Sequence, residues 1–239
     1  MAKEPNTDCE KCESRCKSVF CDMGEKGLSE ISHGKVTNIY KKGSTIFHHT
    51  NPAFGLYCMS SGKVKISKFG NNGKESIVRI ADPGDVIGHR SLFSTEHFNA
   101  TATVIEEAKI CFFNKNLIFK LLKEDKSLGL NLIRRLSKEM GEAEAKTAAM
   151  LQKDVSERLA GFFMNLLQSY GVEEGNRTLI NIRLTREEIA SMIGTANETV
   201  IRFISKFKDE GILEQDGKNL YVINKERLKE VAELGLLKK

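Results

Sequence analysis

The sequence predicts an α+β chain with an N-terminal antiparallel β-roll, a long dimerisation helix and a C-terminal winged helix-turn-helix. Short alternating runs divided by glycine fill residues 34–113, which is typical of an antiparallel roll or sandwich. A helical pattern runs over 128–153, and two amphipathic helices with separate start signals follow at 185–210. The predicted parts are a cysteine-rich segment (1–24), the roll as a sensory domain (25–126), the dimerisation helix (127–153) and the winged helix-turn-helix domain (154–239).

The composition is that of an ordinary globular protein. Of the 239 residues, 40% are hydrophobic and 29% are charged, and the net charge of +5 is compatible with nucleic acid without demanding it. No apolar run approaches the roughly 18–20 residues of a membrane span, and the polar N-terminus lacks the apolar core of a signal peptide. We expect a cytoplasmic protein without a membrane partner. No nucleophile–base pair or phosphate-binding glycine loop occurs in a plausible context, so we expect no enzymatic activity.

The strands of the roll are predicted from alternation. Residues 63–67 alternate cleanly between polar and apolar side chains, and the runs 76–80, 101–104 and 110–113 have β-type composition. Gly43, Gly62 and the Pro83-Gly84 pair fall between such runs and predict turns.

The helix at 128–153 carries a seam of apolar and small residues at alternating spacings of three and four, as in a coiled coil. The seam consists of Leu136, Met140, Ala143, Thr147 and Met150. Alanine and threonine are small for such positions, which predicts a tight but modest dimer contact. The alternative is a single helix that lies on its own roll.

The helix-turn-helix is predicted from its start and stop signals. Thr185-x-x-Glu188 and Thr195-x-x-Glu198 are both capping-box patterns, and Gly194 ends the first helix. A second helix of the domain is expected at 155–169, followed by a loop from Gly171. After the helix-turn-helix, two apolar runs flank an Asp216-Gly217 turn, which predicts the β-hairpin of a wing.

The second helix of this unit presents side chains suited to double-stranded DNA. Glu198 and Arg202 are four residues apart and share one face, where glutamate can accept from cytosine and arginine can donate twice to guanine. The alternative is that Glu198 only caps the helix and Arg202 only contacts phosphate. The full set of predicted DNA contacts is Thr195, Asn197, Glu198, Thr199, Ile201, Arg202, Lys206, Arg186 and Lys218.

The six cysteines are unevenly spread. Cys9, Cys12, Cys16 and Cys21 lie close together, whereas Cys58 and Cys111 stand alone. In a reducing compartment, close-set cysteines are more often metal ligands or redox thiols than structural disulfides. Cys58 lies in an apolar run, so we expect it to be a buried small hydrophobe that is not needed for metal retention.

A β-roll, a long helix and a winged helix in this order resemble the CRP/FNR superfamily of bacterial transcription regulators. The resemblance is carried by the glycine-containing turn 82–88, by 155–160 and by 184–207, and it covers nearly the whole chain. It implies a cyclic-nucleotide-binding-like roll, a homodimer, a palindromic DNA site and contact with RNA polymerase.

The cysteines are similar to those of the FNR branch, whose members hold an iron–sulfur cluster. This implies a [4Fe-4S] cluster ligated by Cys9, Cys12, Cys111 and either Cys16 or Cys21. FNR places its third N-terminal cysteine six residues after the second, and neither candidate has that spacing. From the residues alone, tetrahedral zinc or a metal-free redox thiol pair stays open.

Binding of cyclic AMP is not expected. The resemblance implies that a cyclic nucleotide requires a glutamate after the roll glycine and an arginine for the phosphate, but His89 follows Gly88 and no arginine occurs at 98–101. The scattered histidines are more often surface residues than haem ligands. The leading prediction is a DNA-binding regulator controlled by oxygen, nitric oxide or redox state. The alternative is a nucleotide- or haem-sensing module with a zinc or thiol site.

Overall fold

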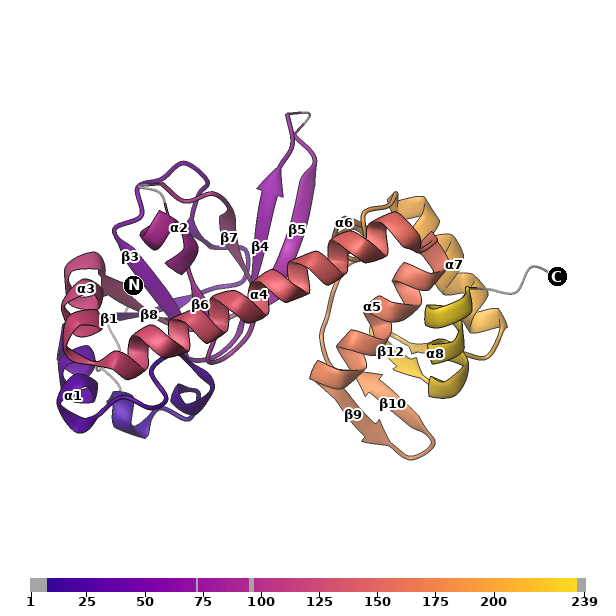
Figure 1. The fold of residues 1–239 in the computed structure, drawn as a ribbon. Helices are drawn as coiled ribbons and strands as arrows, with labels where there is room; N and C mark the ends of the chain where they lie inside the picture. The colour runs from indigo at the N-terminus through magenta and orange to yellow at the C-terminus, as the bar shows by residue number, and fades with distance from the viewer. Residues whose placement is uncertain (1–7, 72, 95–96, 236–239) are drawn as a thin grey trace. The chain divides into compact units, whose positions relative to one another are not determined.

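The computed structural model describes residues 8–71, 73–94 and 97–235, and it divides into two compact units, 1–141 and 142–239 (Figure 1). Among the described residues, no helix is long and apolar enough to cross a membrane. The first unit holds two four-stranded antiparallel sheets, and the second unit holds a helix-turn-helix flanked by a third four-stranded sheet with shorter strands.

The two sheets of the first unit confirm the predicted β-roll. One sheet has the strand order β1-β8-β3-β6 and the other β2-β7-β4-β5. All four predicted runs are strands, each extended by one to three residues. The strands are β1 (Lys35–Tyr40), β2 (Thr45–Phe47), β3 (Gly55–Met59), β4 (Lys63–Phe69), β5 (Glu75–Ala81), β6 (Val86–Ile87), β7 (Thr101–Glu106) and β8 (Ala108–Asn114).

Each face of the first sheet packs into a different hydrophobic core. Met59 and Ile110 belong to a core between the two sheets, together with Val64 and Val104 of the second sheet. The opposite face packs against the N-terminal segment and the helices, and this second core includes Leu56, Cys111, Phe113, Phe20 and Ile31. Because side chains alternate along a strand, residues 56, 58, 111 and 113 face the N-terminal segment.

Several short helices surround the roll that the sequence analysis did not predict. They are η1 (Cys9–Lys11), η2 (Arg15–Lys17), α1 (Glu25–Gly34), α2 (His89–Ser94) and α3 (Lys115–Glu124). α1 contains Gly27 and Gly34 and buries only Leu28 and Ile31, so its helical pattern is weak in the sequence. Tertiary packing against the first sheet stabilises it instead.

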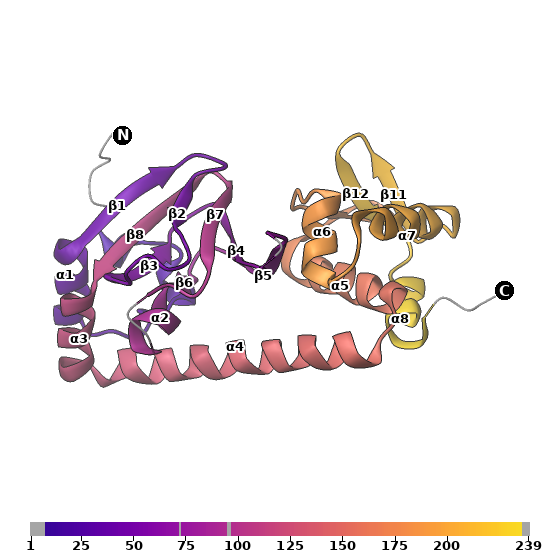
Figure 2. The ribbon, with the colours of Figure 1, turned by 90° about the horizontal axis from the view of Figure 1, so that it is seen from above.

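Helix α4 (Lys126–Gln152) confirms the predicted long helix to within two residues. Leu128 and Leu132 are buried in the core that faces the N-terminal segment. The first half of α4 passes along the side of the roll that carries α2 (Figure 2).

The second unit takes in the end of α4 and continues with α5 (Val155–Tyr170), whose first turn is stabilised by a capping box between Asp154 and Glu157. Its antiparallel sheet has the order β11-β12-β10-β9. The remaining elements are β9 (Gly171–Glu174), β10 (Arg177–Ile180), α6 (Arg186–Ile193), α7 (Asn197–Asp209), β11 (Leu213–Asp216), β12 (Asn219–Val222) and α8 (Lys225–Leu234).

The expected loop after Gly171 is wrong, because β9 and β10 form a hairpin there. All four residues of β9 are exposed, and two of them are glutamates, so the segment shows neither apolar alternation nor strong strand propensity. β9 is a strand because its backbone pairs with β10. The residues of β9 alone do not predict that pairing.

Candidate functional sites: DNA-binding surface, dimer seam and cysteine cavity

The first helix of the helix-turn-helix, α6, begins and ends as the sequence predicts. Thr185 Oγ1 accepts from the backbone N–H of Glu188 at 3.1 Å, and the Glu188 carboxylate accepts from the backbone N–H of Thr185 at 2.9 Å. Gly194 ends the helix in the left-handed region at φ 70°, which glycine adopts without the steric cost other residues meet.

The second predicted capping box is wrong. Helix α7 begins at Asn197 after an Ala196 cap that supplies no side-chain hydrogen bond, so Thr195 lies before the cap. The amide of Thr195 donates to Ala190 O at 3.0 Å and thereby belongs to the closing turn of α6. Glu198 therefore stands in the first turn of α7 without a capping role, and its exposed carboxylate is available to a ligand.

The predicted DNA-contact residues gather on the solvent face of α7 and the wing. Val200, Ile204 and Phe207 are buried and hold α7 against the rest of the unit. On the other face, the exposed contacts are Glu198, Ile201, Arg202 and Lys206, and the half-buried ones are Thr195, Asn197 and Thr199.

The wing is the hairpin of β11 and β12, as the sequence predicts. Lys218 is exposed at its tip. Arg186, at the start of α6, donates to Gln215 Oε1 at 3.1 Å and so links the helix-turn-helix to the wing. Burial lowers the pKa of Arg186. Arg186 is thus partly engaged within the domain, whereas Lys218 projects from it.

The predicted dimer seam lies on an uncovered face of α4 in the single chain. Met140 and Met150 are 63% and 44% exposed, Ala143 and Thr147 are exposed, and Leu136 is half-buried. The sequence analysis missed Ile133, which is 61% exposed and extends the same spacing toward the helix start. The alternative was a helix that lies on its own roll. That contact is made by another face of α4, where Leu128 and Leu132 are buried.

Four cysteines line one small cavity between the N-terminal segment and the first sheet of the roll. They are Cys9, Cys12, Cys58 and Cys111. The fold thus brings together three of the predicted ligands, Cys9, Cys12 and Cys111, from opposite ends of the roll sequence. It also adds Cys58, which is partly buried against the core and lines the cavity rather than filling the core. Cys16 and Cys21 do not line this cavity.

Polar side chains contact three of the four cavity sulfurs. Lys35 is only 5% exposed, and its Nζ donates to Cys9 Sγ at 3.1 Å. Ser14 Oγ lies 3.2 Å from Cys12 Sγ, and Thr37 Oγ1 lies 3.5 Å from Cys111 Sγ. Hydrogen bonds of this kind stabilise the thiolate form and tune any group that the sulfur holds.

The cavity thiols differ in how readily they ionise. Burial raises the pKa of Cys58 well above its ordinary value, and the neighbouring Cys111 and Cys12 raise it further. Burial also raises the pKa of Cys111, although the hydrogen bond with Thr37 opposes the shift. For Cys12, burial is outweighed by hydrogen bonds with Ser14 and other neighbours, so its pKa is lowered.

Four thiols are the donor set of a [4Fe-4S] cluster and equally of tetrahedral zinc, and as they stand they are closed around neither. Zinc would draw four sulfurs to about 2.3 Å from one point. Within residues 8–71, 73–94 and 97–235, no three Cys, His, Asp or Glu side chains form a group that could hold one metal ion. A [4Fe-4S] cluster takes one thiolate on each iron, so its ligands surround a volume. The cavity measures about 20 Å³, room for about one water, so its lining would have to open in order to admit a cluster.

The glycine-containing turn 82–88 touches the cysteine segment on one side. Gly84 has φ 95°, and a Cβ built on it would stand 2.6 Å from Lys17 Cβ and 3.0 Å from Ser14 O. The Gly84 amide donates to Met59 O at 2.8 Å, and Ser14 Oγ donates to the same carbonyl at 3.3 Å. Only a residue without a side chain allows this close approach.

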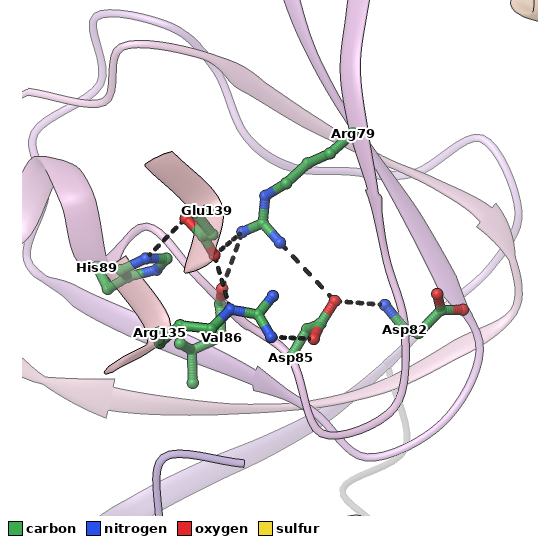
Figure 3. Close-up of polar contacts among 7 residues, drawn as sticks. All are labelled: Arg79, Asp82, Asp85, Val86, His89, Arg135 and Glu139. Atoms are coloured by element: carbon green, nitrogen blue, oxygen red, sulfur yellow. Dashed lines mark hydrogen bonds and ion pairs between the residues drawn. The ribbon is translucent and has the colours of Figure 1, made fainter. Parts of the chain in front are cut away.

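On its other side, the same turn meets α4 through a group of charged side chains (Figure 3). Arg135 Nη1 lies 2.7 Å from Asp85 Oδ1, and Arg135 Nε lies 2.8 Å from Glu139 Oε1. Arg79 lies 3.4 Å from Glu139 and 3.7 Å from Asp85. His89 is 1% exposed, and its Nε2 lies 3.2 Å from Glu139 Oε2.

This charged group was not predicted, and the expectation of surface histidines is wrong for His89. His48, His49 and His97 are exposed, as expected. Burial opposes ionisation of Glu139, but contact with His89 and the charge of Arg79 outweigh it and lower the pKa of Glu139 to about 2. Nothing in the local sequence links 79–89 to 135–139, so only the fold reveals the group.

Comparisons with known proteins agree with this architecture. The family described as "Cyclic nucleotide-binding domain" matches residues 37–125, and the "Crp-like helix-turn-helix domain" matches residues 157–231. The CRP-like cAMP-activated global transcriptional regulator of Mycobacterium tuberculosis is 29% identical over 189 residues, 79% of this chain and 84% of that protein. The anaerobic regulatory protein of Bacillus subtilis is 27% identical over 186 residues, 77% and 78% of the two chains.

A solved structure supports the fold. The c-di-GMP responsive global regulator CLP of Xanthomonas campestris superposes with a TM-score of 0.75 at 18% identity, covering 84% of this chain and 100% of that one. The two family matches fall on the two ends of the chain, in the order roll and helix-turn-helix, with α4 between them. The chain therefore belongs to the CRP/FNR family of transcription regulators.

Proposed function

We propose that this transcription regulator is controlled by oxygen, nitric oxide or redox state through a [4Fe-4S] cluster bound at the cysteine cavity. The observation that carries the proposal is the convergence of Cys9 and Cys12 with Cys111 on one cavity, although a whole roll separates them in sequence. The name of the Bacillus subtilis relative, an anaerobic regulatory protein, points in the same direction.

A bound [4Fe-4S] cluster would supply a sensitivity to oxidants that the protein's own side chains, cysteine included, do not match. Cys9, Cys12 and Cys111 would hold it together with a fourth thiol. Lys35 offsets negative charge at the thiolates from a position 3.1 Å from Cys9 Sγ. Phe20, Ile31 and Phe113 line the cavity and limit the access of water.

The turn 82–88 offers a route from the cavity to α4. Ser14 and Lys17 pack against Gly84, and Asp85 next to it pairs with Arg135 on α4. A shift of the N-terminal segment would therefore change the contacts of α4, the helix that also carries the seam. The proposed output is a change in the population of the dimer formed through Leu136 to Met150.

As a dimer, the chain would present two α7 helices about 34 Å apart, one turn of DNA, to the halves of a palindrome. Glu198 and Arg202 are proposed to read base edges, and Lys206 and Lys218 to contact phosphates. RNA polymerase in the cytoplasm is the proposed downstream partner. We still do not expect cyclic AMP to bind. The residue after Gly88 is His89 and not a glutamate, and the His89 side chain is engaged with Glu139 of α4.

Anaerobic purification tests the proposal. We expect about four irons and four acid-labile sulfides per chain, sulfide-to-iron absorption, and tight binding to a palindromic duplex that weakens after exposure to air. Zinc in place of iron would refute cluster control and favour the zinc alternative. A colourless, metal-free chain would also refute it, and would favour the thiol alternative only if its DNA affinity still changed on exposure to air.

A further inference from the structure

We propose that Cys58 is the fourth cluster ligand, completing the set of Cys9, Cys12 and Cys111, and that Cys16 and Cys21 lie outside it. This inference rests on the proposed function, because it names the ligands of the same site. It differs from the sequence-based expectation, which assigned the fourth position to Cys16 or Cys21 and gave Cys58 no role.

Strand register puts Cys58 beside Cys111. β3 and β8 are antiparallel neighbours, and Cys58 is the direct partner of Cys111. Directly opposed residues project to the same face, with Cβ atoms roughly 4.5–5.5 Å apart. That face is the one turned toward the N-terminal segment, since Leu56 and Phe113 on the same strands pack into the core with Phe20.

The other wall of the cavity supplies the remaining two thiols. Cys9 lies in η1, and Cys12 caps the end of this helix, where its amide donates to Cys9 O at 3.3 Å. The hydrogen bond from the Cys9 amide to Ser32 Oγ, at 2.8 Å, ties η1 to α1. Two thiols on the sheet thus face two on the segment, with the cavity between them.

Cys16 and Cys21 are held away from this cavity. Cys16 is exposed, and it lies near enough to Cys21 to raise the pKa of that thiol. Arg15 Nη1 donates to Cys21 O at 2.7 Å, and the Cys21 amide donates to Ser18 O at 3.2 Å. Either thiol would have to leave this hydrogen-bonded turn in order to join the cavity.

The charge at the cavity also suits four thiolates. Lys35 is nine-tenths buried, and burying an ammonium is costly unless negative charge stands nearby. Four thiolates on a [4Fe-4S] core leave a net negative charge, which the Lys35 contact to Cys9 offsets.

Iron retention by matched variants tests the assignment. The full-length chain, Cys58→Ala, Cys111→Ala and the double variant Cys16→Ser/Cys21→Ser would be reconstituted anaerobically with iron and sulfide. We expect Cys58→Ala and Cys111→Ala to lose nearly all iron and absorption, and the double variant to keep the wild-type complement. Full retention by Cys58→Ala, or loss in the double variant, would overturn the assignment.

A metal-free measurement keeps the inference testable if a variant misfolds. Dibromobimane becomes fluorescent only when it bridges two nearby thiols, and peptide mapping identifies the bridged pair. In the metal-free wild type we expect Cys58 bridged to another cavity thiol, and a separate bridge between Cys16 and Cys21. A bridge from Cys16 or Cys21 to Cys111 would contradict the arrangement.

The two readouts separate the two claims. A wild type that retains no iron would refute the proposed function, whatever the variants do. Bridging of Cys58 to a cavity thiol would then still support a four-thiol site, and its absence would overturn that as well. Iron bound normally by the wild type and by Cys58→Ala would overturn the role of Cys58 alone.

Discussion

The side chains that we propose to carry specificity stand on the exposed face of α7. Glu198 has no capping role there, because the helix begins one residue later than its sequence pattern suggests. Arg202 is exposed beside it, with its guanidinium 5.3 Å from the Phe203 ring. The proposed base contact of Arg202 and the proposed phosphate contact of Lys206 can therefore be tested separately on the same helix.

Replacing Arg202 with alanine should cost roughly 1–3 kcal/mol of binding to the specific site and relax specificity at one G·C pair in each half-site. Lys206→Ala is the matched control and should weaken specific and random duplexes equally. Fluorescence anisotropy at fixed salt measures both. Equal weakening of both duplexes by Arg202→Ala would show that Arg202 contacts only phosphate.

Glu139 gives stability a predictable pH dependence. An unfolded glutamate titrates near 4.3, whereas the folded pKa is about 2. The depressed pKa means that the stabilisation is fully present above about pH 4.5 and is lost as the pH falls toward 2.

Glu139→Gln should therefore lower the free energy of unfolding at pH 7 by roughly 3 kcal/mol. The gap from wild type should close as the pH falls from about 4.5 to 2. Urea titrations of the metal-free protein measure it, with the exposed Glu144→Gln on the same helix as the control. A gap that stays constant over this pH range would contradict the charge pairing.

At the scale of elements, α4 serves two surfaces at once. Leu132, Arg135 and Glu139 face the roll, while Ile133 and Met140 are exposed on the seam face. The two sets interleave along one helix, so the contact with the roll and the proposed seam belong to the same element.

A charge on the seam should break the dimer. Met140→Glu, or Ala143→Asp, should shift dimer toward monomer and abolish binding to the palindrome, because a buried unpaired charge is costly. Ala145→Glu is the control, since it adds a carboxylate to an exposed position on the opposite face of the same helix. An unchanged dimer in sedimentation of Met140→Glu would show that the seam lies elsewhere.

The turn 82–88 can be tested with a pair of glycines. Gly84→Ala introduces backbone strain at φ 95° and also a Cβ that collides with Lys17 and Ser14 O. Gly43→Ala meets similar strain at φ 86° with nothing within 4 Å. We expect both to lower the unfolding temperature by a few degrees, but only Gly84→Ala to loosen the N-terminal segment and reduce iron retention. Equal iron retention would contradict the role of the turn.

Local signals in the sequence predicted the elements that carry their own start, stop or alternation. The capping box and Gly194 predict α6, and polar–apolar alternation predicts β4. α1 and β9 have no such signal, because packing and strand pairing stabilise them.

The candidate sites were predictable to the extent that their residues lie close in sequence. The predicted contacts on α7 lie on one helix, so the sequence alone was enough to place them on a common face. The role of Cys58 depends on its register with Cys111, and the role of His89 on its contact with Glu139. Strand pairing and helix docking bring together residues that are far apart in the chain. These contacts cannot be predicted from the local pattern of a single sequence.

At the scale of the whole molecule, the proposed cluster and the DNA are linked through the dimer. If the cluster favours the dimer, a palindrome that captures the dimer must favour retention of the cluster by the same factor, typically about 5- to 150-fold for such couplings. We expect iron retained at a fixed chelator concentration to rise when palindromic duplex is added.

The controls for this linkage are a scrambled duplex and the Met140→Glu variant. Neither should raise iron retention, since the first does not select the specific dimer and the second cannot form it. A rise with scrambled duplex as large as that with the palindrome would show that the protection is electrostatic and does not pass through the dimer.

The register that sets Cys58 opposite Cys111 has an evolutionary consequence. A sheet holds two such positions together through any change in loop length, whereas a ligand in the N-terminal segment depends on spacing. In related genes that encode a cysteine at the position of Cys58, the positions of Cys16 and Cys21 should lose their cysteines freely, whereas the buried Val19 and Phe20 between them should be kept. Genes that encode another residue at that position should show the opposite history, with a third N-terminal cysteine kept at fixed spacing across lineages.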